Sequence, residues 1–148
     1  MKAHVPRFVA AVAVIVVALT ASADANAPAG RYTTANGTVY DTKTKLTWQE
    51  AVPTGTYTWA NAKAYCAGLS LNGTGWRLPT IKELQTIVDD SQANPSIDTT
   101  AFPSTPTSWF WSSSPLAGSP SLAWWVNFFY GDTLHVDVSN SYYVRCVR

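Results

Sequence analysis

Cysteine, histidine and charge are all scarce in this chain. Its 148 residues include two cysteines and two histidines, and only 13% are Asp, Glu, Lys or Arg. One of the histidines is His4, so the rest of the chain offers too few nitrogen and sulfur ligands for a zinc site, which usually takes three or four. No apolar run reaches the roughly 20 residues that a helix needs to cross a bilayer. These scarcities argue against a zinc enzyme and against a stable transmembrane anchor.

The first 27 residues show the order of features found in a secretory signal peptide. Two basic residues precede a run of twelve apolar residues, Phe8 to Leu19, and small residues follow that run. We expect cleavage after Ala23 or after Ala27, which leaves residues 28–148 as one domain of ordinary size. The protein is then secreted, periplasmic or at the cell surface, with no transmembrane anchor after cleavage.

Charge is balanced in the expected domain. Residues 28–148 contain eight Lys or Arg and eight Asp or Glu, without a basic cluster. This balance argues against nucleic acid as an electrostatic partner. The same residues contain all seven Trp and all seven Tyr, more large rings than a core of this size needs. Some of the rings are therefore candidates for a recognition surface.

Cys66 and Cys146 are the only cysteines of the chain. An exported protein folds in an oxidising compartment, where two cysteines most simply form one bridge, and a pair of free thiols is the alternative. A bridge that closes 80 residues would stabilise the fold by roughly 4 to 5 kcal/mol in the chain-entropy model.

Short strands and turns are expected to begin the domain. Asn36-Gly37 favours positive φ and separates Tyr32–Thr34 from Val39–Asp41, which predicts a hairpin. A further short strand is expected at Leu46–Trp48.

Two helices are expected next. The first begins after Thr58 and ends near Gly68, and the second begins after Thr80, which can form a capping box with Glu83. Apolar residues at helical spacing give each helix a buried face. These faces comprise Trp59, Ala62, Cys66 and Leu69 in the first helix and Leu84, Ile87 and Val88 in the second.

The segment that joins the helices is interpreted as structural. Trp76 and Leu78 should share one face of a short strand with Arg77 on the other, and Pro79 should stop that strand. The residues assigned this structural role are Trp76, Arg77, Leu78, Pro79, Thr80 and Glu83.

The remainder of the chain is expected to be a long loop followed by strands. Residues 89–108 contain three prolines and many polar residues, so they predict an irregular loop held to the core by Ile97 and Phe102. Turn signals then separate strands expected at 110–113, 123–128, 133–138 and 142–147, with one of the turns at Pro115–Pro120. Strands, two helices and an antiparallel meander define an α+β domain.

Several motifs in order resemble the bacterial DUF1566 family, also called the Lcl C-terminal domain. They are Trp59–Ala62, Gly75–Thr80 followed by Glu83-Leu84, Phe110–Ser114 and Val144–Arg148. The resemblance implies a C-type-lectin-like fold, with two helices packed on a small antiparallel sheet with long loops. It also implies a bridge from a cysteine on a helix to one in the final strand, the places of Cys66 and Cys146.

The resemblance further implies an exported or cell-surface module, because the best-known relatives are adhesins that bind glycosaminoglycans and other surface ligands. This chain lacks their collagen-like repeat and any excess of Lys or Arg. It also lacks the Glu-Pro-Asn, Gln-Pro-Asp and Trp-Asn-Asp motifs of calcium-dependent lectins. Asp132, Asp137 and Asn140 would hold calcium only if the last two turns fold together, so no metal or other cofactor is assigned.

The proposed binding face lies in the last strands. Alternation places Trp124, Val126 and Phe128 on one side of a strand and Trp125, Asn127 and Phe129 on the other, and one side must be core. In the next strand His135 and Asp137 face away from the apolar side formed by Leu134, Val136 and Val138. The predicted ligand-binding residues are Trp125, Asn127, Tyr130, Asp132, His135 and Asp137. In the alternative interpretation, the extra rings fill a small core and His135 is an ordinary surface residue.

We therefore predict a recognition or adhesion module, without catalytic activity, that binds a glycan or a surface protein. One alternative is a small enzyme that pairs His135 with a serine of 112–114 and with Asp132 or Asp137, or one related to formylglycine-generating enzymes. The latter would need free cysteines. A structural component of the cell envelope is the other alternative.

Overall fold

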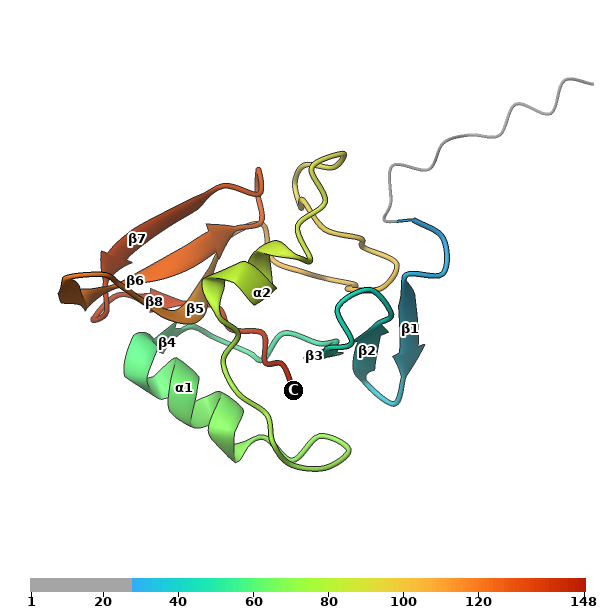
Figure 1. Ribbon diagram of the computed structural model, residues 1–148, viewed down its shortest axis with the longest axis horizontal. Helices are drawn as coiled ribbons and strands as arrows, with labels where there is room; N and C mark the ends of the chain where they lie inside the picture. The colour runs from blue at the N-terminus through green and yellow to red at the C-terminus, as the bar shows by residue number, and fades with distance from the viewer. Residues whose placement is uncertain (1–27) are drawn as a thin grey trace, which may run out of the picture.

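The computed structural model describes residues 28–148, so the predicted signal peptide lies outside the described residues. These residues form two short helices and three small antiparallel sheets (Figure 1). The α+β class is therefore confirmed. Within this part of the chain, neither helix has the length and apolar character needed to span a membrane.

The first sheet contains β1 (Tyr32–Ala35), β2 (Thr38–Asp41) and β3 (Thr47–Gln49). Asn36 and Gly37 connect β1 to β2 with φ of 50° and 78°, the left-handed conformation that a tight two-residue hairpin requires. The hairpin prediction is confirmed.

The first helix, α1 (Trp59–Gly68), follows β4 (Tyr57–Thr58), which pairs with β8 (Ser141–Tyr142). Thr58 is the N-cap residue as predicted, but its side chain makes no capping hydrogen bond. The buried residues of the helix are Ala62 and Cys66.

The second helix, α2 (Ile81–Gln85), has the predicted capping box. The Thr80 hydroxyl accepts from the Glu83 amide at 3.2 Å, and the Glu83 carboxylate accepts from the Thr80 amide at 2.8 Å. The helix is shorter than its apolar pattern predicted. The amides of Ile87 and Val88 each donate to the carbonyl three residues earlier, so Ile87 reaches the core from a tighter turn.

The third sheet has the order β5 (Trp109–Leu116), β6 (Ser119–Asn127) and β7 (Thr133–Asp137). The turn predicted over Pro115–Pro120 is wrong in its extent, because β5 and β6 continue into a hairpin whose turn is Ala117-Gly118 alone, with a φ of +77° at Gly118. Irregular pairing near Pro115 accommodates a proline that cannot donate to the ladder.

The predicted strand 142–147 is also wrong, since only its start belongs to β8. Residues 143–148 contact several elements in turn instead of one strand. The Tyr143 amide donates to the Trp109 carbonyl, and Val147 forms single bridges with Trp48 and Arg77. A segment whose hydrogen bonds go to separate partners cannot form a continuous ladder.

Two hydrophobic clusters lie on opposite faces of the third sheet. Phe110 and Val126 enter the cluster beneath α2, whereas their neighbours Trp111 and Trp125 enter the cluster beneath α1. Alternate residues of a strand point to opposite faces, so β5 and β6 supply both clusters. The loop 89–108 contains no helix or strand, and fully buried Ile97 and Phe102 hold it to the α2 cluster, as predicted.

Cys66 and Cys146 form the predicted disulfide, with an S–S distance of 2.03 Å. Both residues are fully buried in the α1 cluster. The bridge therefore joins α1 to the final segment of the chain.

Candidate functional site

Trp125 does not lie on an exposed face. Only 7% of the residue is accessible, and its ring packs near those of Trp109 and Tyr142, with centroid distances of 6.1 and 6.5 Å. This predicted binding residue is therefore corrected to a core residue. Alternation along β6 showed that Trp124 and Trp125 point apart, but not that α1 and β8 cover the Trp125 side.

The predicted grouping of Trp125 with His135 is also wrong. In the β6–β7 register, Trp125 lies opposite Leu134 and Trp124 lies opposite His135. Residues directly opposite in an antiparallel pair share a face. His135 therefore lies on the side of Trp124, and Leu134 is half exposed instead of lying on a continuous apolar side.

The remaining predicted residues are spread over the turns that flank β7. Asn127 accepts a hydrogen bond from the Phe129 amide at 3.0 Å and so fixes a turn, while Tyr130 projects from that turn with 70% of its surface exposed. Asp137 accepts from the Ser139 amide and hydroxyl at 2.9 and 2.7 Å, and these bonds lower the pKa of its carboxyl.

The two turns do not fold together, which corrects the calcium arrangement considered above. Asp132 and Asp137 lie at opposite ends of β7, roughly 17 Å apart at about 3.3 Å per residue of strand. Asn140 does meet Asp137, because its side-chain amide donates to the Asp137 carbonyl at 3.1 Å. Among residues 28–148, no three His, Cys, Asp or Glu side chains gather as a metal site.

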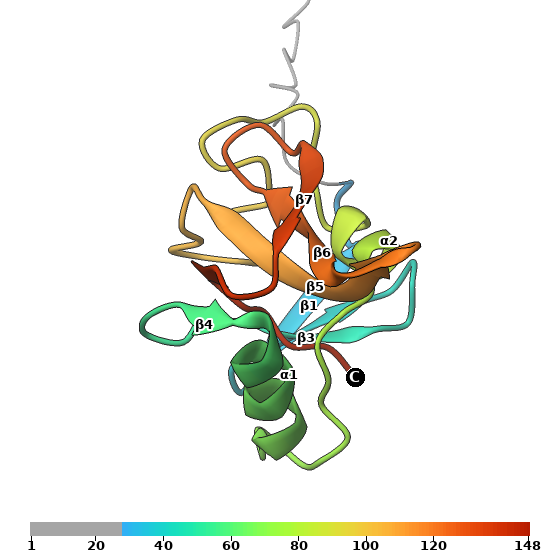
Figure 2. The ribbon, with the colours of Figure 1, turned by 90° about the vertical axis from the view of Figure 1, so that its left-hand side faces the viewer.

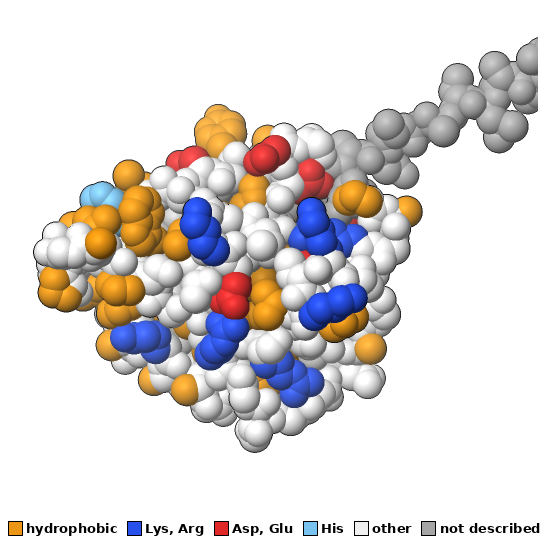
Figure 3. All heavy atoms as spheres, viewed as in Figure 1, with side chains coloured by type: hydrophobic (Ala, Val, Ile, Leu, Met, Phe, Trp, Pro, Cys, Tyr) orange, Lys and Arg blue, Asp and Glu red, His pale blue; other side chains and the backbone are white. Residues whose placement is uncertain are grey.

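The structure instead brings His135 to Trp124 beside α2. Their ring centroids are 5.2 Å apart and the planes are nearly perpendicular, at 88°. Between Trp124 and α2 lies a cavity of about 320 Å³, which we call the α2–β6 groove. Its lining residues are Ile81, Lys82, Gln85, Trp124 and Thr133. Figure 3 shows hydrophobic side chains gathered over the β6–β7 end of the molecule.

Two serines of β5 hold the opposite walls of this groove. The Ser112 hydroxyl donates to the Trp124 carbonyl at 2.7 Å, and the Ser114 hydroxyl accepts from the Ile81 amide, the first of α2, at 3.0 Å. From the sequence, this serine run is expected in a strand and, in the enzyme alternative, as a source of a nucleophile. The structure pairs the His135 ring with Trp124, and Ser112 with a backbone carbonyl.

An ion pair anchors the start of α2. The Arg77 guanidinium donates to both oxygens of Glu83, at 2.7 and 2.6 Å, and these bonds lower the pKa of the Glu83 carboxyl to about 2. Arg77 also pairs through its backbone with Val147. Trp76 and Leu78 are buried, whereas the Arg77 side chain is about half exposed, and the predicted short strand is reduced to the single bridge at Arg77.

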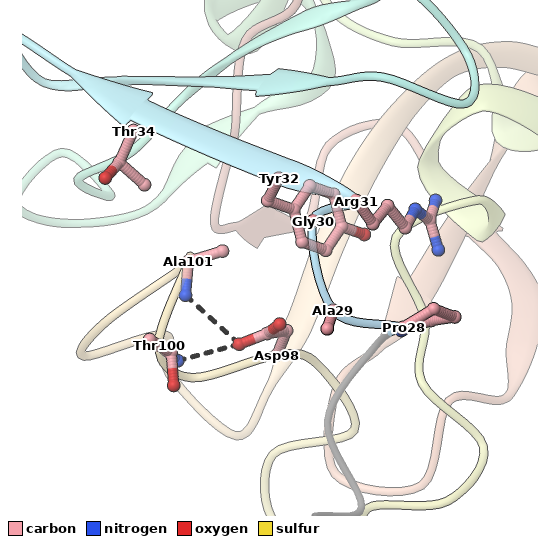
Figure 4. Close-up of a pocket in the computed structure, with 9 residues that line it drawn as sticks. All are labelled: Pro28, Ala29, Gly30, Arg31, Tyr32, Thr34, Asp98, Thr100 and Ala101. Atoms are coloured by element: carbon pink, nitrogen blue, oxygen red, sulfur yellow. Dashed lines mark hydrogen bonds between the residues drawn. The ribbon is translucent and has the colours of Figure 1, made fainter.

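The charged groups of two other cavities already have partners. In a cavity of about 230 Å³ beside β1 (Figure 4), Asp98 accepts from the amides of Thr100 and Ala101, and Arg31 forms an ion pair with Asp41 at 2.8 Å.

The cavity of about 410 Å³ between α1 and the Arg77–Thr80 segment is lined by two cations that are also engaged. The Lys63 ammonium lies 3.5 Å from the centre of the Trp59 ring, and Arg77 binds Glu83.

The α2–β6 groove differs in that its charged side chain, Lys82, is unengaged. Three side-chain groups of the groove have no hydrogen bond or ion pair within residues 28–148. They are the Lys82 ammonium, the side-chain amide of Gln85 and the Thr133 hydroxyl. They surround a half-buried indole ring and an aliphatic side chain. An aromatic surface beside free donors and acceptors suits a ligand with an apolar face and a polar rim.

Residues 28–148 are thus a small α+β domain closed by one disulfide, with a groove between α2 and β6 and no assembled metal cluster. The family model of the Lcl C-terminal domain matches residues 37–148, and the chain belongs to this family. A search of curated proteins found no match.

Proposed function

We propose that the protein is an exported, non-enzymatic recognition module that binds a glycan in the α2–β6 groove. The observation that carries this proposal is the position of Trp124, whose ring forms one wall of a cavity with unengaged polar groups at its rim. A pyranose ring has an apolar face of C–H groups that stacks on an indole, while its hydroxyls need hydrogen-bond partners.

The rest of the lining, from α2 and from Thr133 of β7, supplies partners of the required kinds. Lys82 donates, whereas the Gln85 amide and the Thr133 hydroxyl both donate and accept. Ile81 adds an apolar contact. The cavity volume of about 320 Å³ is at the low end of the roughly 300 to 1,000 Å³ usual for ligand sites, which favours a terminal sugar over a long polymer segment.

We further propose a C-type-lectin-like architecture for the domain. Two helices on small antiparallel sheets, a long loop and a bridge from α1 to the final segment support this proposal. The groove would then work without calcium. Export through the N-terminal signal agrees with the disulfide, since such bonds persist in oxidising compartments.

A glycan array probed with the purified mature protein tests the function. Trp124→Ala is expected to reduce binding to the retained glycans by about tenfold or more, because a stacked ring contributes on the order of 1 to 2 kcal/mol. Lys82→Ala should also weaken binding, and this substitution leaves the core intact because the Lys82 side chain is exposed. Tyr130→Ala is the control, since this ring is the most exposed large hydrophobic side chain and lies outside the groove. Equal binding by the wild type and both groove variants, or no binding to any glycan, would refute the proposal.

A further inference from the structure

β7 is an edge strand with an unoccupied side. It pairs with β6 alone, and within residues 28–148 no other strand pairs with it. β7 lies at the periphery in Figure 1, and Figure 2 shows it in front of β6 with no further element before it. Unpaired backbone groups along such an edge are a template for another strand.

The hydrogen-bond pattern shows which backbone groups face outward. The Val138 amide donates to the Ser121 carbonyl, and the Asn127 amide donates to the Asp132 carbonyl. In an antiparallel ladder, hydrogen-bonded pairs alternate with pairs whose amides point away. The backbones of Leu134 and Val136 therefore face β6, and those of Thr133 and His135 face outward.

The side chains beside this edge are apolar on one face and polar on the other. Leu134 is 52% exposed on the same face as Trp109, which is 43% exposed. Thr133 and His135 lie on the opposite face. The strand carries neither proline nor lysine, the residues that commonly block edge pairing. A partner strand that alternates apolar and polar side chains would match both faces.

We propose that β7 binds an extended segment of another protein by strand addition. The segment would pair with the N–H and C=O groups of Thr133 and His135 and pack an apolar residue beside Leu134. A second copy of the chain is a poorer occupant. Two paired edges of five residues bury far less than the roughly 1,200 to 2,000 Å² of a stable interface, whereas a short linear segment needs only such an edge.

Proline substitution tests the edge directly. His135→Pro removes an outward amide, and proline is tolerated where the N–H of an edge strand faces solvent. Peptides selected from a displayed library of random ten-residue segments on the mature wild-type protein serve as probes. His135→Pro should bind them at least tenfold more weakly than His135→Ala, which also lacks the ring but keeps the N–H.

The matched control is Thr34→Pro on β1, an edge strand of another sheet. The Thr42 amide donates to the Arg31 carbonyl, so the amide of Thr34 points outward in the same way. This variant should bind the peptides as the wild type does.

A second measurement does not depend on the fold of any variant. Two peptides are compared, each N-methylated at one of the two sets of alternate amides. Only the peptide whose methyl groups face β7 should lose binding. When the unmodified peptide binds, the His135 amide should gain protection from hydrogen exchange. The proposal is overturned if no peptide is selected, if the His135→Pro and His135→Ala proteins bind equally, or if β7 pairs with a second copy in solution.

Discussion

Removing the disulfide should cost a large part of the stability of the domain. The bridge joins residues 80 positions apart, and loop closure of that length stabilises by about 4.5 kcal/mol at 25 °C in the chain-entropy model. Domains of this size have unfolding free energies of about 5 to 15 kcal/mol. A domain of this size, between the small and large domains for which the conversion is known, loses roughly 3 to 5 °C of Tm per kcal/mol. A loss of about 4.5 kcal/mol therefore corresponds to a fall in Tm of roughly 13 to 22 °C.

The double variant Cys66→Ala, Cys146→Ala measures this effect by thermal unfolding followed by circular dichroism. Alanine is preferred to serine because both positions are fully buried, where an unpaired hydroxyl adds its own cost. The control is wild-type protein that has been unfolded, reduced and refolded in reductant. In this protein the bond that closes the 80-residue loop is broken, but both sulfur atoms remain. A fall of less than about 5 °C in both proteins would refute the loop-closure argument.

Two further predictions concern charged side chains. The folded-state pKa of Glu83, about 2, lies below its ordinary 4.5, so the Arg77 pair contributes stability that is complete above pH 4.5 and is lost as the pH falls toward 2. Solvent screens this partly exposed pair, so we expect the unfolding free energy of the wild type to fall by about 1 to 2 kcal/mol over this pH range. The Glu83→Gln protein should lack this fall. Superimposable plots of unfolding free energy against pH for the two proteins would contradict the prediction. Arg145 is fully buried and donates to the carbonyls of Gln49 and Glu50 and to the Thr105 hydroxyl. Arg145→Lys should cost about 2 to 3 kcal/mol in urea unfolding, because one ammonium cannot replace the guanidinium fork, and an unchanged midpoint would disprove that role.

Features fixed by neighbouring residues could be predicted from the sequence. The hairpin depends on Asn36-Gly37, and the capping box depends on Thr80 and Glu83, three residues apart. In each case the residue types satisfy a local backbone requirement that tertiary contacts do not alter. The α+β class followed from the order of such segments.

Features that depend on distant partners could not be predicted in this way. The alternation of β6 is visible in the sequence, but the elements that cover each side come from elsewhere in the chain. Trp125 is buried because α1 and β8 lie over it, and Trp124 borders a cavity because α2 lies across from it. The final segment looks like a strand by composition, yet its backbone contacts several elements.

The groove and the disulfide belong to different halves of the molecule. Cys66 and Cys146 lie in the cluster beneath α1, on the face of the third sheet that contains Trp125. The groove lies on the opposite face, and its walls are joined through Ser112 and Ser114. The disulfide therefore stabilises the face of the third sheet that is opposite the groove, and it does not itself contact the groove. Ser112 is fully buried and its hydroxyl donates to the Trp124 carbonyl, so a contact within the sheet fixes the backbone that carries this indole. The groove is therefore built on the rigid core instead of on the surrounding loops.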